Sequence, residues 1–181
     1  MKTTIFLFHP DLTSSQVNRT LAAAASEAGF EVRDLYRLYP DGEIDVPAEQ
    51  AAMEESDRIV LQFPMYWYSC PPLLKKWEDL VLEYGWAYGS TGTKLHGKEL
   101  LIAVSPGAPA DNYQHSGSVN YTVNELLRPF QATSNLIGTK YLTPFVTAGA
   151  SAISDSDLAD QAQKYVDYLK KDNIPLLAAH E

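Results

Sequence analysis

The chain has 181 residues, a net charge of −9, 45% hydrophobic residues and 20% charged residues. These values are typical of a globular protein large enough for one core, and we expect a single domain over residues 1–181. The acidic balance argues against the clustered positive charge that binds nucleic acid, so no nucleic-acid partner is expected.

Signals for membranes, secretion and metals are also missing from the sequence. No apolar run approaches the roughly 18 residues needed to cross a bilayer. The apolar stretch near the N-terminus is too short for a signal peptide. The single Cys70 excludes an internal disulfide, and the four scattered histidines have no metal-ligand spacing. We therefore expect a cytoplasmic protein without a metal site.

The predicted elements alternate between strand and helix along the chain. Strands are expected at Thr3–Phe8, Glu31–Leu35, Ile59–Phe63, Leu100–Val104 and Lys140–Val146. Helices are expected at Val17–Ala28, Pro47–Ser56, Pro71–Glu83, Val123–Gln131 and, capped by Ser154, through Leu169. Pro129 stands near the end of its helix, and Pro144 interrupts the last strand.

The first, third and fourth predicted strands are continuous apolar runs instead of alternating ones. Strands buried on both faces have this pattern, so we expect a doubly wound α/β fold, with helices on both faces of a five-stranded parallel sheet. In such sheets a ligand binds at the carboxyl ends of the strands, where the strand order reverses. The loops His9–Asn18, Pro64–Cys70 and Ser105–Tyr113 are expected to meet there.

Each of these three loops also has a simpler interpretation. Thr13–Ser15 puts hydroxyls and free amides at a helix N-terminus, which suits an anion but also plain helix capping. The aromatic run Met65–Tyr68 suits a flat ring or a partner surface, or else packing on the next helix. Gly107 lets the backbone approach a ligand closely, or serves a bare turn.

Longer stretches of the chain match a known family. The matching segments include His9-Pro10, Ser15 to Asn18, Gln62 to Ser69, Pro72 to Trp77, Gly85 to Gly89 and Leu95 to Lys98. The chain resembles the flavodoxin-like NAD(P)H quinone oxidoreductases. It looks closest to the bacterial branch of glutathione-regulated potassium-efflux ancillary proteins and their stress-protein relatives. The resemblance implies a flavodoxin-like fold, a flavin (FMN or FAD) and a homodimer.

The resemblance also implies roles for individual residues. The flavin's phosphate and ribityl end would be held by His9, Ser15, Gln16, Val17 and Asn18. The flavin ring would lie against Met65, Tyr66, Trp67 and Tyr68, with its pyrimidine edge at Ser105, Pro106, Gly107 and Ala108. Gly107 and Tyr113 would act in catalysis, and Trp67, Tyr88 and Tyr113 would contact the substrate, Tyr88 from the partner subunit.

Two departures from the family pattern affect these roles. The family commonly has Thr-Thr-Gly-Gly after the fourth strand, where this chain has Ser-Pro-Gly-Ala, and Pro106 has no N–H to donate. A histidine of the mammalian enzymes falls on Val119 here, while His115 is off register and is as well explained by a solvent-facing loop position.

The implied activity is a two-step cycle in which NAD(P)H reduces the flavin and a quinone-like small acceptor then takes two electrons. One rival interpretation is a flavin-binding regulatory subunit docked on a potassium-efflux antiporter at the inner membrane. Another is a one-electron flavodoxin carrier. Cys70 is expected to be a buried apolar residue, and Asp11, Asp34 and Asp45 to be turn residues without a catalytic role.

Overall fold

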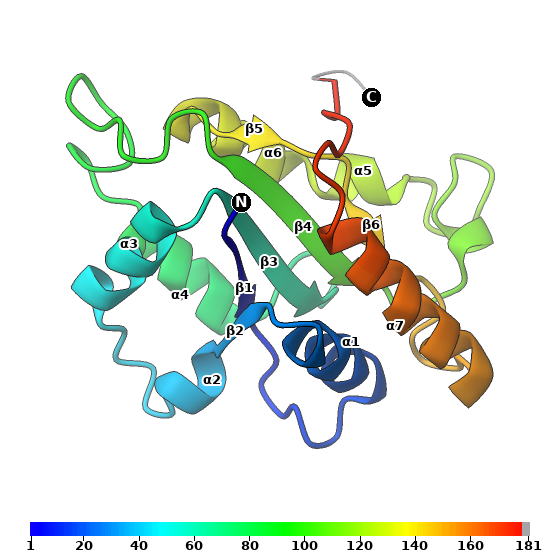
Figure 1. Cartoon of the computed structure of the whole chain (residues 1–181). Helices are drawn as coiled ribbons and strands as arrows, with labels where there is room; N and C mark the ends of the chain where they lie inside the picture. Colours follow the sequence, from blue (N-terminus) through cyan, green and yellow to red (C-terminus); the bar gives the residue numbers. More distant parts are fainter. Residues whose placement is uncertain (179–181) are drawn as a thin grey trace.

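A parallel β-sheet forms the centre of the molecule in the computed structural model, which describes residues 1–178 (Figure 1). The strand order is β2-β1-β3-β4-β5, and a further strand, β6, also pairs with β4. The strands are β1 (Thr3–Leu7), β2 (Glu31–Asp34), β3 (Arg58–Pro64), β4 (Glu99–Ser105), β5 (Lys140–Tyr141) and β6 (Phe145–Val146). All the pairings are parallel, which confirms the predicted sheet.

The fifth position of the sheet is filled by two short strands, although the sequence predicts one. Pro144 lies between β5 and β6 and has no N–H for the ladder, so the pairing with β4 is interrupted. The outer edge of β5 is paired with residues near the C-terminus: the amide of Leu177 donates to Tyr141 at 3.0 Å, and the amide of Thr143 to Pro175 at 2.8 Å.

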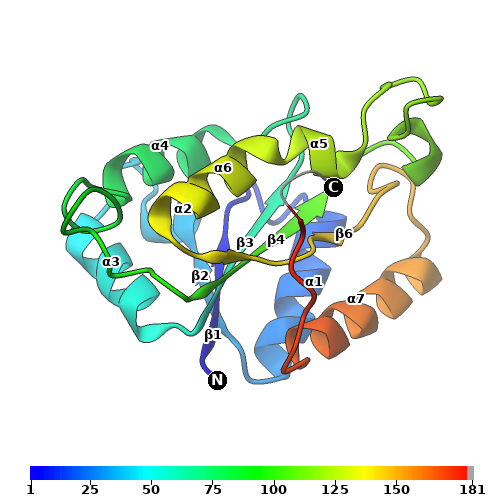
Figure 2. The ribbon, with the colours of Figure 1, turned by 90° about the horizontal axis from the view of Figure 1, so that it is seen from above.

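Helices cover both faces of the sheet, as predicted. Figure 2 shows α1 (Gln16–Glu27) and α7 (Asp155–Leu169) on one face. The other face carries α3 (Val46–Glu55), α4 (Pro72–Val81) and α6 (Arg128–Ile137). Three short elements complete the chain: α2 (Leu35–Leu38), α5 (Val123–Leu126) and the 3₁₀-helix η1 (Ala110–Asn112). Within residues 1–178, no helix has the length and apolar character to cross a bilayer.

Two differences from the predicted elements have a clear local cause. The helix expected at Val123–Gln131 is instead the pair α5 and α6, because Pro129 stands in the first turn of a second helix and does not end the first. The strand expected at Glu31–Leu35 stops one residue early. Asp34 there caps α2 by accepting a hydrogen bond from the amide of Arg37 at 3.3 Å.

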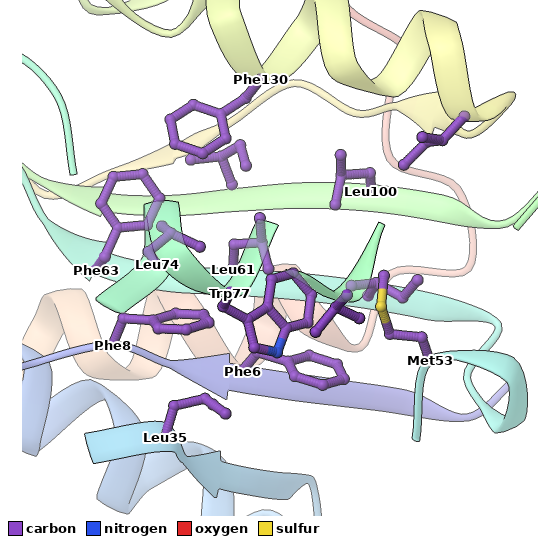
Figure 3. Packing of buried hydrophobic residues seen from close by; sticks show 14 of the residues in the cluster. Phe6, Phe8, Leu35, Met53, Leu61, Phe63, Leu74, Trp77, Leu100 and Phe130 are labelled. Atoms are coloured by element: carbon purple, nitrogen blue, oxygen red, sulfur yellow. The ribbon is translucent and has the colours of Figure 1, made fainter. Parts of the chain in front are cut away.

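Trp77 on α4 is the centre of the larger hydrophobic core (Figure 3). It is 1% exposed, and its ring centroid lies 5.4 Å from that of Phe6 and 5.6 Å from that of Phe8. Phe63 meets Phe130 of α6 at 5.2 Å on the same face. The apolar runs of β1 and β3 are therefore continuous because their side chains fill cores on both faces of the sheet.

A buried carboxylate ties α3 to this core. Glu49 is fully buried and accepts hydrogen bonds from Tyr39 Oη at 2.7 Å, from Trp77 Nε1 at 3.1 Å and from Arg33 Nη2. Burial raises the pKa of Tyr39 to about 12, so its hydroxyl remains a donor. We call these four residues the Glu49 cluster. It fixes β2, α3 and α4 together.

Candidate functional site

A pocket of about 400 Å³ opens at the carboxyl end of the sheet. The loops after β1, β3 and β4 all line it, as predicted, and so does the loop after β6. Its lining residues are His9, Ser14, Ser15, Gln16, Val17, Asn18, Pro64, Met65, Tyr66, Ser105, Gly107, Ala150 and Ser151. Three segments far apart in the sequence therefore meet at the edge of the sheet where ligands of such folds bind.

The N-terminus of α1 forms one end of the pocket. Ser15 caps the helix, its Oγ accepting from the amide of Asn18 at 3.1 Å. Within the described residues, the amides of Gln16 and Val17 have no hydrogen-bond acceptor, as expected in a first helical turn. These two N–H groups and the helix dipole form a site for an anion such as a phosphate. The Gln16 side chain donates to Asp155 of α7 at 3.0 Å.

His9 borders this anion site as a neutral imidazole. Burial lowers its pKa below the ordinary value. Its Nδ1 accepts a hydrogen bond from the amide of Asp11 at 3.2 Å, so the proton is carried by Nε2. Asp11 itself accepts from Thr13 Oγ1 at 2.6 Å, which makes it a turn residue, as predicted.

A buried chain of hydrogen bonds runs beneath the pocket from α7 to β4. Tyr165 Oη donates to Gln62 Oε1 at 3.1 Å, and Gln62 Nε2 donates to the Asn18 carbonyl oxygen at 3.0 Å. Asn18 Nδ2 then donates to Ser105 Oγ at 2.8 Å. We call these four residues the Tyr165 chain. Each is at most 5% exposed, and the predicted cofactor residue Asn18, which also lines the pocket, joins two loops through its side chain.

The loop after β3 ends in a tight turn that presents aromatic side chains. Tyr66 and Ser69 exchange backbone hydrogen bonds of 3.2 and 2.9 Å. Trp67 and Tyr68 between them have φ angles of 46° and 62°, so the turn is of type I′. Non-glycine residues in this region cost about 1–3 kcal/mol each. Trp67 is nevertheless 92% exposed, so it does not pack on the next helix.

Ser105 at the end of β4 and Gly107 of the loop after it line the other end of the pocket, and Ala108 directly follows Gly107 in the chain. The amide of Met65 donates to the Ser105 carbonyl at 3.1 Å and holds this loop against the aromatic turn. The carbonyls of residues 106–108 accept from the amides of residues 149–151 at 2.7 to 3.2 Å. Among residues 1–178, the N–H groups of Gly107 and Ala108 have no acceptor. They remain donors for a ligand, whereas Pro106 has none.

Sequence reasoning missed Ala150 and Ser151, which line the pocket from the loop after β6. A Cβ atom on Gly107 would lie 2.7 Å from Ser151 Oγ. A side chain at position 107 would therefore require the Ser151 side chain to move. No motif in the sequence around residue 150 signals this contact, because it depends on how the two loops fold together.

Other predicted residues lie away from the pocket. Tyr113 is buried and lines a neighbouring cavity of about 300 Å³ beside α5. The loop that contains Tyr88 leads into the start of β4, at the opposite end of the sheet from the pocket (Figure 1), and Tyr88 lines a separate cavity with residues of α4 and α6. His115 is exposed and its Nε2 lies 2.9 Å from Glu125, which fits the solvent-facing alternative. Backbone and histidine hydrogen bonds lower the pKa of Glu125 to about 2.

Cys70 and the remaining turn aspartates have ordinary structural roles. Cys70 is half-buried, and burial raises the pKa of its thiol, so it is not an activated thiolate. Asp45 caps α3 by accepting from the amide of Ala48 at 3.1 Å. The absence of a catalytic role for these residues stays a prediction.

Comparison with known proteins identifies the family. Residues 1–169 match the family described as having a flavodoxin-like fold. The chain belongs to this family. The predicted family and fold are therefore confirmed.

Three curated relatives are similar over most of their length. General stress protein 14 of Bacillus subtilis is 52% identical, covering 94% of this chain and 98% of the relative. A protein of the same organism named as an uncharacterized NAD(P)H oxidoreductase is 50% identical, with 96% and 100% covered. A glutathione-regulated potassium-efflux system ancillary protein of Klebsiella aerogenes is 43% identical, with 89% and 90% covered. These names are those of the predicted branch.

Two solved structures are also close. A general stress protein 14 of Treponema denticola, solved in complex with FMN, is 43% identical with a TM-score of 0.89, covering 93% of this chain and 98% of that one. A structure named as a thermophilic tryptophan halogenase from Streptomycin violaceusniger is 54% identical with a TM-score of 0.92, covering 94% and 99%. That name gives another reaction than the relatives' names, although the fold is the same.

Proposed function

We propose that this protein is an FMN-dependent NAD(P)H oxidoreductase that reduces quinones or similar small acceptors by two successive hydride transfers. One observation carries the proposal: three loops converge on a single pocket that has unpartnered amides at both ends and an exposed tryptophan beside it. An NAD(P)H oxidoreductase among the relatives and FMN in a solved neighbour support the same assignment.

The residues present fit FMN. The amides of Gln16 and Val17 suit a phosphate at the N-terminus of α1, and the neutral His9 adds an Nε2–H donor beside them. The amides of Gly107 and Ala108 suit the carbonyl and nitrogen acceptors along one edge of a flavin ring. The exposed Trp67 supplies a flat apolar surface for that ring.

Bound FMN would supply the chemistry, taking a hydride from NAD(P)H and giving it to the acceptor. The contribution of the protein's own residues is to hold the cofactor and to stabilise the charge that develops on it. The unpartnered amides of Gly107 and Ala108 stabilise negative charge that develops at their end of the pocket. Ser105 Oγ already accepts from Asn18, so its own proton is left to donate. The exposed aromatic face of Trp67, in the turn after β3, would help to orient a flat reactant.

We also propose that the protein acts as a homodimer and that residues 1–181 form one domain. Large apolar side chains are exposed along α4, α6 and the loop after α4, namely Leu80, Tyr84 and Leu136. A second copy would cover them. Tyr88 lies next to this surface, far from its own pocket, so we propose that it contacts the acceptor in the partner's pocket, with Tyr113 of the pocket's own loop as a further contact.

A second candidate function is a flavin-binding ancillary subunit of a potassium-efflux antiporter. The 43% identity to such an ancillary protein favours it. Both roles are proposed for the cytoplasm, and in this second role the antiporter would bring the protein to the inner membrane. The two roles share the pocket and the cofactor, so only turnover separates them.

Steady-state kinetics of the FMN-loaded protein test the proposed function. With NAD(P)H and a quinone varied together, double-reciprocal plots should give parallel lines, because the two half-reactions share one pocket. Intersecting lines would contradict this cycle. Protein that binds FMN tightly but oxidises no NAD(P)H would favour the ancillary role, and protein that binds no flavin would exclude both.

A further inference from the structure

A second cavity, larger than the proposed flavin pocket, lies at the β2 edge of the sheet. Its volume is about 490 Å³, within the range of small-molecule sites. It is formed by α1, β2 and α2, and it shares the loop after β1 with the flavin pocket: Leu12 lines this cavity, whereas His9 and Ser14 line the flavin pocket. Its lining residues are Leu7, Leu12, Arg19, Ala22, Ala23, Ser26, Glu31, Val32, Arg33, Asp34, Arg37 and Leu38.

Arginines are concentrated around this cavity. Three of the five arginines in the chain line it, although acidic residues outnumber basic ones by 23 to 14. Arg33 forms an ion pair with Glu49, and Arg58, elsewhere in the fold, forms an ion pair with Glu99. Arg19 and Arg37 differ from these two: within residues 1–178 neither forms an ion pair.

The two unpaired guanidinium groups are available to an anion. Arg19 Nη1 donates to the Thr13 carbonyl at 3.0 Å, a neutral acceptor that leaves the charge uncompensated. The side chain of Arg37 has no hydrogen-bond partner among the described residues. A protein rich in carboxylates offers many partners to an arginine. Arg19 and Arg37 are both exposed, so their guanidinium groups are accessible, and two such groups at one cavity suit a phosphate or carboxylate of a ligand.

The rest of the cavity suits a flat heterocycle that carries hydroxyl groups. Its floor is apolar, with the buried Leu7 and Ala22 next to the half-buried Val32. Asp34 uses only Oδ1 to cap α2, so Oδ2 remains an acceptor for a ribose hydroxyl or a ring amine. Ser26 adds a hydroxyl on the α1 side. The apolar floor, the arginines at the rim and the free carboxylate oxygen of Asp34 together match the base, the phosphate and the ribose of a phosphorylated nucleoside.

We propose that this cavity, which we call the arginine pocket, binds the phosphorylated adenosine of an adenine nucleotide. Two sources have this chemistry: the adenosine end of NADPH whose nicotinamide occupies the flavin pocket, and a separate free nucleotide. Assignment to NADPH rests on the proposed oxidoreductase function, whereas nucleotide binding at the arginine pocket does not.

Calorimetric titration of the FMN-loaded protein with adenosine 2′,5′-bisphosphate tests the proposal. Arg37→Gln should weaken binding about tenfold, because a charge-assisted hydrogen bond to phosphate is lost at a partly exposed site. Arg19→Gln should have a similar effect. Lys140→Gln removes one positive charge at the opposite edge of the sheet and should leave the affinity unchanged. FMN affinity of Arg37→Gln should equal that of the unmodified protein.

Competition then separates the two sources. If the bisphosphate competes with NADPH, and Arg37→Gln raises the KM for NADPH more than that for NADH, the arginine pocket holds the donor's adenosine end. If it binds without competing, the pocket takes a free nucleotide. No binding of the bisphosphate, or equal binding to the unmodified protein and both arginine variants, overturns the proposal, even if NAD(P)H turnover is normal. If the bisphosphate binds in an arginine-dependent way but the protein shows no NAD(P)H turnover, only the proposed oxidoreductase function is contradicted.

Discussion

Two buried polar networks of this molecule, the Glu49 cluster and the Tyr165 chain, lie on opposite faces of the sheet and end differently. In the Glu49 cluster a fully buried carboxylate receives three donors, one of them charged. In the Tyr165 chain all members are neutral, and every donor points toward the proposed flavin pocket, from Tyr165 through Gln62 and Asn18 to Ser105.

The difference separates a structural network from one that serves a site. The Glu49 cluster is closed in the sense that its hydrogen bonds all end on one fully buried carboxylate, and none of its four residues lines the proposed flavin pocket, so FMN binding should not depend on it. The Tyr165 chain is open, because the Ser105 hydroxyl receives one bond and keeps its own proton for the pocket. Mutations in the two networks should therefore separate stability from ligand binding.

The largest effect on stability is expected for Glu49→Ala. The change leaves Arg33 without its carboxylate and removes the acceptor of Tyr39 and Trp77. Breaking a buried ion pair in this way costs about 3–5 kcal/mol in the free energy of unfolding, measured by urea denaturation. FMN affinity of the folded protein should not change.

The control for this variant is Glu43→Ala. Glu43 lies 3.3 Å from Lys76 in an exposed pair and should contribute less than about 1 kcal/mol. Equal losses in the two variants would show that the Glu49 cluster has no special role in stability.

Two smaller effects are expected for Tyr165→Phe, one on stability and one on FMN affinity. Loss of the hydroxyl leaves Gln62 Oε1 without its donor and should cost about 1–2 kcal/mol of stability. It should also weaken FMN binding about threefold, because Asn18 and Ser105 are then held less firmly. Fluorescence titration with FMN measures the second effect.

Tyr168→Phe is the matched control on the same helix. Its hydroxyl donates to the Thr143 carbonyl at 2.8 Å and has no link to the pocket. It should lose similar stability but keep full FMN affinity. A parallel loss of FMN affinity in both variants would break the distinction between closed and open networks.

Much of the fold follows from local features of the sequence. The continuous apolar runs of β1, β3 and β4 require burial on both faces, which only a parallel sheet between helix layers provides. Pro129 was misassigned because proline is compatible with both the end of one helix and the first turn of the next. Only packing of α6 against Phe63 decides between them.

The candidate site was predictable only in outline. The meeting of three loops follows from strand order, which the alternation of elements indicates. The direction of the Asn18 side chain does not follow, because an amide one turn into a helix fits either a ligand or a neighbouring loop. Ser151 and the arginine pocket depend on contacts between segments with no sequence motif in common.

The central claim, that α1 presents free amides to the phosphate of FMN, is tested most directly by comparing Gln16→Pro with Gln16→Ala. Both variants lose the side-chain bond to Asp155, but only proline removes the backbone N–H. Proline suits this first helical position, and Ser15 before it already has the extended backbone that a following proline requires. Titration with FMN should show about tenfold weaker binding for Gln16→Pro than for Gln16→Ala. Equal affinities in two folded variants would contradict the account.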